Sequence, residues 1–164
     1  MACDASPERL RYTIGRHAGS REPLRALFAL AEDSPEQLAA YLDLGEVLTA
    51  SNADGVLGHI QIIDTEQPDQ LEIKSMAVDP GVQGRGIGRA LVEAALELAR
   101  DQGRCKVVVA TASADTGNLR FYQRLGLRLE RVVPDAFTPA TGYPAGIEID
   151  GIPLRDQVWL SINL

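Results

Sequence analysis

The spacing of apolar side chains in the first forty residues predicts one strand and two helices. Arg11–His17 is a short β-prone run, whereas residues 22–31 place apolar side chains three and four positions apart, as one face of a helix requires. Ser34 followed by Pro35 has the form of an N-cap and a first helical residue, so a second short helix is expected to begin there and to run through Tyr41.

Three β-prone runs follow, at residues 46–50, 56–63 and 71–78. The connection between the first two ends in Asp54 and Gly55, and Asp-Gly is a favoured pair in tight hairpins. A polar loop separates the second run from the third. These features predict an antiparallel meander of three strands.

The middle of the chain changes to a glycine-rich turn and a long amphipathic helix. Residues 81–86 are rich in glycine, and Ile87–Gln102 carries apolar side chains on one face and charged side chains on the other. Gly103 provides a stop signal for this helix. Cys105–Ala112 is then almost continuously apolar, which is typical of a buried strand that lies parallel to its predecessor across a helical crossover.

The remaining segments predict a short helix and two more strands. The helix is expected at Asn118–Leu125 and the strands at Leu127–Val133 and Gln157–Asn163, with a long Pro- and Gly-rich connection at 134–156. Together the elements indicate an α/β fold of mixed α+β type. In it, a twisted mixed sheet of six to seven strands is flanked by about four helices.

Length and composition limit the classes of protein that the chain can represent. Its 164 residues, 45% of them apolar, suit a single domain spanning 1–164 with one hydrophobic core. The formal charge of −7 and the lack of a Lys/Arg cluster argue against a nucleic-acid partner. No run approaches the roughly 18 apolar residues of a membrane span, and the N-terminus lacks an apolar signal core. We therefore expect a cytoplasmic protein with no membrane partner.

Cysteine and histidine are too few and too scattered to predict a metal site. Cys3 and Cys105 are expected to be reduced thiols, because two cysteines do not make a disulfide framework in a chain of this length. Only His17 and His59 accompany them. We therefore expect no metal cofactor.

Anion binding is the chemistry that the glycine-rich turn favours. A helix N-terminus carries free backbone N–H groups and partial positive charge, and glycines let a pyrophosphate approach them. The segment Gln83–Gly88 (QGRGIG) has this form, and Arg85 and Arg89 add positive charge to an otherwise acidic chain. The alternative is a turn that only reverses the chain, although glycines at a helix start cost stability unless close approach is needed.

Spacing excludes two familiar nucleotide-binding motifs at this turn. A P-loop requires Lys and Ser/Thr after its last glycine, but Gly86 is followed by Ile87 and Gly88. A dinucleotide fingerprint requires a glycine at its sixth position, but the sixth residue counted from Gly84 is Arg89. The turn therefore belongs to another kind of anion site.

Two segments together resemble the GNAT superfamily of acyl-CoA N-acyltransferases. Gln83, Gly86 and Gly88 match the family signature of Gln or Arg, two residues, Gly, one residue, and Gly or Ala. Asn118–Leu127 (NLRFYQRLGL) resembles the second signature, a short helix with Asn, a Phe-Tyr pair and a Leu-Gly ending. The order of the predicted elements also agrees with the family fold.

This resemblance implies an N-acetyltransferase that uses acetyl-CoA as donor and a primary amine of a small molecule or peptide as acceptor, by direct transfer in a ternary complex. It also implies that the Met76–Val78 backbone pairs with the pantetheine arm, and that one N–H there polarises the thioester carbonyl. The implied cofactor-binding residues are Met76, Ala77, Val78, Gln83, Gly84, Arg85, Gly86, Ile87, Gly88, Arg89, Asn118 and Tyr122.

Tyr122 stands where many members of this family place the general acid that protonates the departing thiolate. A phenol of pKa near 10 and a thiol of pKa near 8.5 make that proton transfer nearly balanced. The alternative is a core residue, because Leu119, Tyr122 and Leu125 share one helix face.

An amine acceptor also needs a base, because at pH 7 only about one in 2,500 molecules of an amine of pKa near 10.4 is neutral. Glu72 matches the position of the glutamate base in one branch of the family, and it can act directly or through water. Strand alternation predicts Glu72, Lys74 and Met76 on one face, with Lys74 pairing with the carboxylate and keeping its pKa low. A solvated strand glutamate is the alternative. His59 is a weaker candidate for the base and is more simply interpreted as a structural histidine.

The connection at 134–156 is too long for a plain turn. A packed loop and a contact within a homodimer are two interpretations of it, and an acceptor pocket is the third. Five of its residues can line a pocket for a cationic amine: Phe137, Tyr143, Glu148, Asp150 and Asp156.

Two further functions agree with the same signatures. A catalytically silent acyl-CoA-binding sensor or interaction domain would bind the cofactor equally well. O-acylation or the use of a longer acyl donor is the other alternative. The identity of the acceptor is not predicted by any of these patterns.

Overall fold

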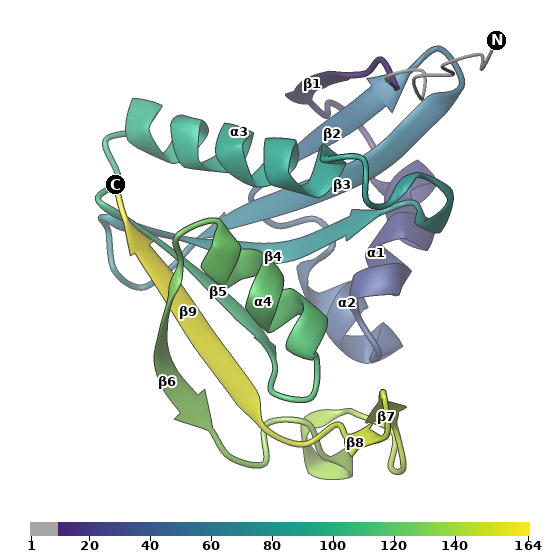
Figure 1. Ribbon diagram of the computed structural model, residues 1–164, viewed down its shortest axis with the longest axis vertical. Coiled ribbons are helices and arrows are strands. Elements are labelled where there is room, and N and C mark those ends of the chain that lie inside the picture. Colours follow the sequence, from purple (N-terminus) through teal and green to yellow (C-terminus); the bar gives the residue numbers. More distant parts are fainter. Residues whose placement is uncertain (1–9) are drawn as a thin grey trace, which may run out of the picture.

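Seven strands within residues 10–164 form one mixed sheet in the order β1-β2-β3-β4-β5-β9-β6 (Figure 1). The protein is seen in a computed structural model, which describes residues 10–164, so Cys3 lies outside the described residues. Its strands are β1 (Thr13–Arg16), β2 (Glu46–Asn52), β3 (Gly55–Asp64), β4 (Gln70–Val78), β5 (Lys106–Ala112), β6 (Arg128–Val133) and β9 (Gln157–Asn163). The predicted fold class is confirmed.

Strand directions follow the predicted order. β1 to β4 are antiparallel neighbours, whereas β5 runs parallel to β4 after the helical crossover, as predicted. The predicted hairpin at Asp54 and Gly55 is also confirmed, with Ala53 and Asp54 as its two turn residues. The Oδ1 of Asn52 stabilises it by accepting hydrogen bonds from the backbone N–H of Asp54 and Gly55, at 2.9 and 3.2 Å.

Four α-helices within residues 10–164 flank the sheet. None of the helices in this part of the chain is long and apolar enough to cross a membrane. The predicted helix at 22–31 consists of a 3-10 turn (Glu22–Leu24) followed by α1. The helices are α1 (Arg25–Ala31), α2 (Pro35–Tyr41), α3 (Ile87–Asp101) and α4 (Thr116–Arg124).

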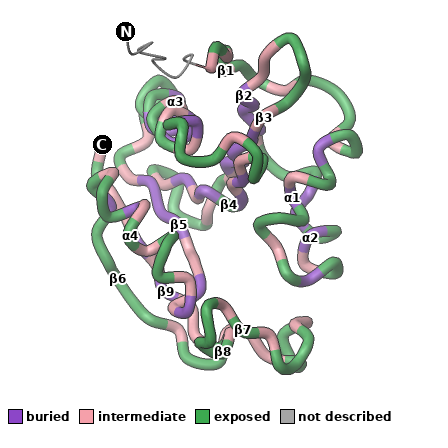
Figure 2. Tube along the Cα trace, turned by 45° about the vertical axis from the view of Figure 1, so that its right-hand side comes forward, coloured by how far each residue is buried: buried purple, intermediate pink, exposed green. Residues whose placement is uncertain are grey.

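Two clusters of buried side chains lie on opposite faces of the sheet. Phe28 of α1 belongs to one cluster with Val47 of β2, whereas Leu91 of α3 and Tyr122 of α4 belong to the other with Leu48. Because successive side chains of a strand point to opposite faces, Val47 and Leu48 place the two clusters on different sides. Figure 2 shows the buried residues gathered on β2 to β5, while β6 at the sheet edge is mostly exposed.

A bulge interrupts β4. Ser75 pairs with Gln61 and Ile73 pairs with Ile62, so Lys74 has no partner on β3. Beyond this point the strand alternation is shifted by one residue. Met76, which is opposite Ile60, therefore lies on the α3 face, whereas Glu72 lies on the other face opposite Ile63. The prediction that Glu72, Lys74 and Met76 share one face was wrong for Met76.

β4 and β5 pair over a short length only. Their ladder begins at Gln70 and Lys106 and ends at Ile73 and Val109. Beyond it the strands separate, so the edge of β4 that includes Met76–Val78 has no strand partner on the β5 side. The sheet is therefore open along its middle.

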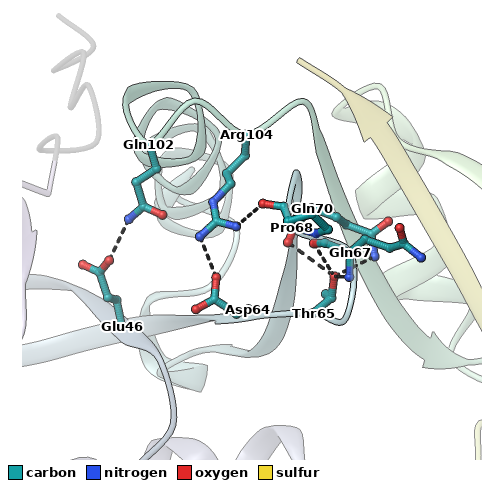
Figure 3. A network of polar contacts seen from close by, with 8 residues as sticks. All are labelled: Glu46, Asp64, Thr65, Gln67, Pro68, Gln70, Gln102 and Arg104. Atoms are coloured by element: carbon teal, nitrogen blue, oxygen red, sulfur yellow. Dashed lines mark hydrogen bonds and ion pairs between the residues drawn. The ribbon is translucent and has the colours of Figure 1, made fainter.

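Polar contacts join the C-terminal end of α3 to the start of β2 and to the end of β3 (Figure 3). Gln102 Nε2 donates to Glu46 Oε1 at 2.7 Å, and Arg104 Nη2 lies 2.6 Å from Asp64 Oδ1. Arg104 also donates to the carbonyl of Pro68. These contacts are mostly exposed, and each is expected to contribute at most about 1 kcal/mol.

The long connection contains a hairpin that the sequence analysis did not predict. β7 (Glu148–Ile149) and β8 (Ile152–Pro153) pair around Asp150 and Gly151, whose φ angles are 51° and 78°. Two consecutive positive φ angles are what Asp-Gly favours in a two-residue hairpin. The Asp-Gly pair that predicted the first hairpin therefore also occurs in this one, as Asp150 and Gly151.

Ser34 joins this connection to α2. Its buried Oγ accepts a hydrogen bond from Gln37 N at 3.2 Å, which confirms the predicted N-cap, and donates to the carbonyl of Gly142 at 2.7 Å. Gln37 Nε2 also donates to the carbonyl of Thr141 at 3.1 Å. The connection is therefore fastened to the start of α2.

Replacing Ser34 with Ala is expected to lower the free energy of unfolding by about 1 to 2 kcal/mol, because both the cap and the bond to the connection are lost. Urea unfolding followed by circular dichroism measures the change. Ser20→Ala is a control, since the exposed Oγ of Ser20 accepts one local bond, from Glu22 N, and the change should alter stability by less than about 0.5 kcal/mol. Equal effects of the two variants would contradict the fastening role of Ser34.

Candidate active site

A cleft of about 1080 Å³ opens where β4 and β5 separate. The N-terminal ends of α3 and α4 form its walls on one face of the sheet, and the end of α1 and the 134–156 connection form them on the other. The separated ends of β4 and β5 lie between the two groups of walls. The cleft can therefore be reached by two different molecules, one from each face.

The glycine-rich turn forms the start of α3 at one wall of the cleft. Gly84 and Gly86 have φ angles of 76° and 83°, in the left-handed region that side chains disfavour. Gly86 is the N-cap of α3 and brings no side chain to cap it, and the first intrahelical bond runs from Ala90 N to Gly86 O at 3.0 Å. The backbone N–H groups of the first turn are thus free to bind an anion.

Contacts with neighbouring residues fix the position of this turn. Gln83 Nε2 donates to the carbonyl of Val78 at 3.0 Å, which joins the turn to the open end of β4. A Cβ on Gly88 would lie 3.4 Å from Cζ of Phe121, so the starts of α3 and α4 approach each other closely here. Asn118 is in the first turn of α4, where its backbone N–H donates to the N-cap carboxylate of Asp115 at 2.8 Å.

Tyr122 both belongs to the core and lines the cleft. Its side chain is 4% exposed and packs in the α3 and α4 cluster, with the ring of Phe121 edge-on at 5.0 Å. Burial, with a smaller effect from the carboxylate of Asp115, raises the pKa of the Tyr122 phenol well above its usual value. The phenol therefore keeps its proton at neutral pH, as a general acid must. The expectation of a nearly balanced transfer to the thiolate was wrong, because burial makes this phenol a weaker acid than a free tyrosine. Tyr122 can therefore be a core residue and still be available as a general acid in the cleft.

Glu72 and Lys74 meet on the face of the cleft that is formed by the end of α1 and the 134–156 connection. Lys74 Nζ lies 3.6 Å from Oε1 of Glu72, as the sequence analysis predicted. The expected low pKa was wrong: burial raises the pKa of the Glu72 carboxyl, and Lys74 lowers it by less. The reason is that the Glu72 side chain is only 13% exposed, so it is no solvated strand residue.

His59 is in the core and does not line the cleft. Its ring is fully buried and stacks on Phe28 at 4.0 Å, and its Nε2 forms a hydrogen bond of 2.9 Å with the Oγ of Ser75. Burial lowers the pKa of the imidazole to about 4, so the ring is neutral at physiological pH. Its surroundings are those of a structural histidine.

Acidic and aromatic side chains line the face of the cleft that is formed by the end of α1 and the 134–156 connection. Glu32, at the end of α1, lies near the phenols of Tyr41 and Tyr143, and after burial its charge is the main factor that raises the pKa of both. Phe137 and Tyr143 pack edge to face at 4.9 Å. Asp33 and Glu148 add further carboxylates to the lining. This end of the cleft therefore has the negative charge and the aromatic surface that suit a cationic amine.

Two of the five residues expected in this pocket lie elsewhere. Phe137, Tyr143 and Glu148 line the cleft, but Asp150 and Asp156 do not. Asp150 is at the exposed tip of the β7-β8 hairpin, and Asp156 accepts a hydrogen bond from the backbone N–H of Asp135 at 2.9 Å. For these two carboxylates the expectation was wrong, because Asp150 is at the tip of the hairpin and Asp156 is bonded to the backbone of Asp135.

The fold brings nearly all of the predicted site residues to this one cleft. Arg85 is the exception, since it does not line the cleft. Sequence patterns did not point to Glu32 and Asp33, which come from a different part of the chain and carry no motif. The predicted residues that line the cleft are Glu72, Met76, Ala77, Val78, Gln83, Gly84, Gly86, Ile87, Gly88, Arg89, Asn118 and Tyr122.

Metal-ligating side chains are scattered in the described part of the chain. His, Cys, Asp and Glu nowhere within residues 10–164 gather in a group of three or more that could hold a metal ion. The free thiol of Cys105 is exposed and lies outside the cleft.

Comparison with known families identifies the class of protein. Residues 9–127 match the acetyltransferase (GNAT) family, and the chain therefore belongs to it. A Bacillus subtilis protein, the uncharacterized N-acetyltransferase YvbK, is 31% identical over 157 residues, which cover 96% of this chain and 98% of the relative. The resemblance inferred from the two signatures is confirmed.

Solved structures share the fold along almost the whole chain. The crystal structure of a Bacillus subtilis acetyltransferase in complex with CoA superposes with a TM-score of 0.85 at 30% identity, covering 94% of this chain and 99% of that one. A GNAT family acetyltransferase from Elizabethkingia anophelis with acetyl-CoA bound gives 0.85 at 29% identity, covering 93% and 98%.

Proposed function

We propose that this acetyltransferase moves an acetyl group from acetyl-CoA directly to a primary amine of a small molecule or peptide. The proposal rests on the cleft between β4 and β5, which has the uncapped start of α3 on one face and the partly buried carboxylate of Glu72 on the other. Donor and acceptor can then be held together, as direct transfer in a ternary complex requires. The CoA complexes of two similar proteins support the choice of donor.

The donor is proposed to bind along the α3 and α4 side. The free N–H groups at the start of α3, together with the side chain of Arg89, would hold the pyrophosphate. The unpartnered edge of β4 at Met76–Val78 would pair with the amide groups of the pantetheine arm, and an N–H there would donate to the thioester carbonyl oxygen. Asn118 would give a further polar contact from α4.

The acceptor is proposed to bind on the opposite face. Glu72 would take a proton from the incoming ammonium, directly or through water, because a protonated amine has no lone pair for attack. Its raised pKa makes it a stronger base than an exposed glutamate once it is ionised. Tyr122, which lines the same cleft and keeps its proton, would protonate the departing CoA thiolate.

Binding of acetyl-CoA to a Gly86→Glu variant tests the donor site. The new carboxylate would stand at the helix start and repel the pyrophosphate, so we expect the affinity to fall at least about tenfold. Isothermal titration calorimetry measures it. Gly103→Glu is a matched control, because Gly103 lies at the other end of α3 with a similar φ of 71°, and a Cβ at either glycine would meet nothing within 4 Å.

Both variants carry similar backbone strain and the same added charge, so only the position relative to the cleft differs. Gly103→Glu should therefore keep the wild-type affinity. The proposal fails if the wild-type protein shows no binding at millimolar acetyl-CoA, or if the two variants bind equally well.

A further inference from the structure

Lys74 has an unusual position for a strand lysine. It occupies the β4 bulge, at the point where the open edge of the strand begins and two residues after Glu72. Its side chain is 34% exposed and lines the cleft. A primary amine of the chain itself therefore lies inside the site where an acceptor amine is expected.

The contacts of Lys74 are those that an acceptor ammonium would need. Its Nζ lies 3.6 Å from the Glu72 carboxylate and 5.1 Å from the centre of the Tyr41 ring, so a base and an aromatic face already hold the charge. A change of rotamer would move the amine toward Met76–Val78 without any change of backbone.

The lysine content makes this position stand out. The chain has only two lysines, Lys74 and Lys106, among its 16 basic residues. Lys106 is equally accessible, with 29% of its side chain exposed, and it too pairs with a glutamate, Glu130, at 2.7 Å. Lys106 does not line the cleft, however. The two lysines thus differ in their place relative to the site and hardly at all in exposure or pairing.

We propose that Lys74 is an internal acceptor, which bound acetyl-CoA acetylates in the absence of a free amine. This inference rests on the proposed function, because it uses the same donor, base and acid. The ε-ammonium loses one proton to Glu72, which passes it to solvent, and the neutral nitrogen attacks the thioester carbon. The C–N bond forms and the C–S bond breaks. The nitrogen gives its second proton to the ionised Glu72, and Tyr122 protonates the thiolate to give the CoA thiol and then regains a proton from solvent.

Acetylation changes the charge of the acceptor face. The amide of acetyl-lysine is neutral, so Glu72 would lose the one ammonium that contacts it within residues 10–164. Each chain can undergo this reaction once. The acetylated fraction would therefore report how long the protein had been in contact with acetyl-CoA without an acceptor amine.

Mass spectrometry of the full chain tests the proposal. The wild-type protein is incubated with acetyl-CoA and no amine, and its intact mass and peptides are followed with time. We expect a gain of about 42 Da located at Lys74, while Lys106 stays unmodified. Lys74→Arg should abolish the gain, and Lys106→Arg should keep it. Glu72→Gln should slow acetylation of Lys74 at least about tenfold, because the base is lost.

Parallel measurements separate this inference from the proposed function. If the protein binds acetyl-CoA and acetylates a free amine but Lys74 stays unmodified, the inference is wrong and the proposed function stands. Acetylation of Lys106 as fast as Lys74 would show uncatalysed chemistry and would also overturn it. If no acetyl-CoA binds, both fail.

Discussion

Replacing Tyr122 with Phe is expected to lower kcat about 10²-fold or more, while the affinity for acetyl-CoA stays unchanged. The ring contacts with the core remain, because Phe keeps the shape that packs beside Phe121 and the α3 cluster. Only the proton donor is removed, so the CoA thiolate would have to leave unprotonated. Thiol release during turnover measures kcat, and calorimetry measures the affinity.

Tyr12→Phe is the matched control for this variant. Tyr12 packs against the same cluster from a position outside the cleft, so its loss of a hydroxyl should leave kcat within about twofold of the wild type. A Tyr122→Phe enzyme with wild-type kcat would show that Tyr122 is only a core residue. A wild-type protein that binds acetyl-CoA but transfers nothing to any amine would instead favour the silent sensor.

Replacing Glu72 with Gln is expected to lower kcat/KM about 10²- to 10⁴-fold, the usual contribution of a general base. Gln has nearly the same shape and fits the same space beside Lys74, so the loss would report the missing proton acceptor. Glu97→Gln is the control, because Glu97 is exposed on the outer face of α3 and lies outside the cleft. Steady-state kinetics with a saturating donor measure the effect.

The pH dependence of kcat/KM is a second test of Glu72 as the base. Burial raises the pKa of this carboxyl, so the base is ionised only above a pKa that is higher than usual for glutamate. Wild-type kcat/KM should therefore fall as the pH decreases through that raised value. The limb that belongs to Glu72 should be absent in Glu72→Gln. An unchanged profile together with near wild-type kcat/KM would leave Glu72 without a catalytic role.

The elements of the fold could be predicted from the sequence because their signals are local. The N-cap at Ser34, the Asp54-Gly55 turn and the glycine-rich start of α3 each lie within a few residues of the structure that they determine. The bulge at Lys74 could not be predicted in this way. It depends on how β3 and β4 pair, and that register is set by long-range packing.

The α3 side of the cleft was predictable for the same reason, whereas the opposite side was not. The residues proposed to bind the donor come from two short segments, Met76–Val78 and Gln83–Arg89, and from α4. The acceptor face instead joins Glu32, from the end of α1, to Tyr143, more than a hundred positions later in the chain. No short pattern connects such residues, which approach each other because the connection is bonded to Ser34 and Gln37 at the start of α2.

The short ladder between β4 and β5 has a consequence for cooperativity. Within residues 10–164, the short segment 69–73 makes the backbone bonds that join the first four strands to β5 and its neighbours in the sheet, so the two parts can open with some independence. A donor that lies between the separated strand ends would contact both parts of the sheet and hold them together. We therefore expect bound acetyl-CoA to slow amide hydrogen exchange in β5 and β9 as well as in β4, so that the substrate merges two units of unfolding into one.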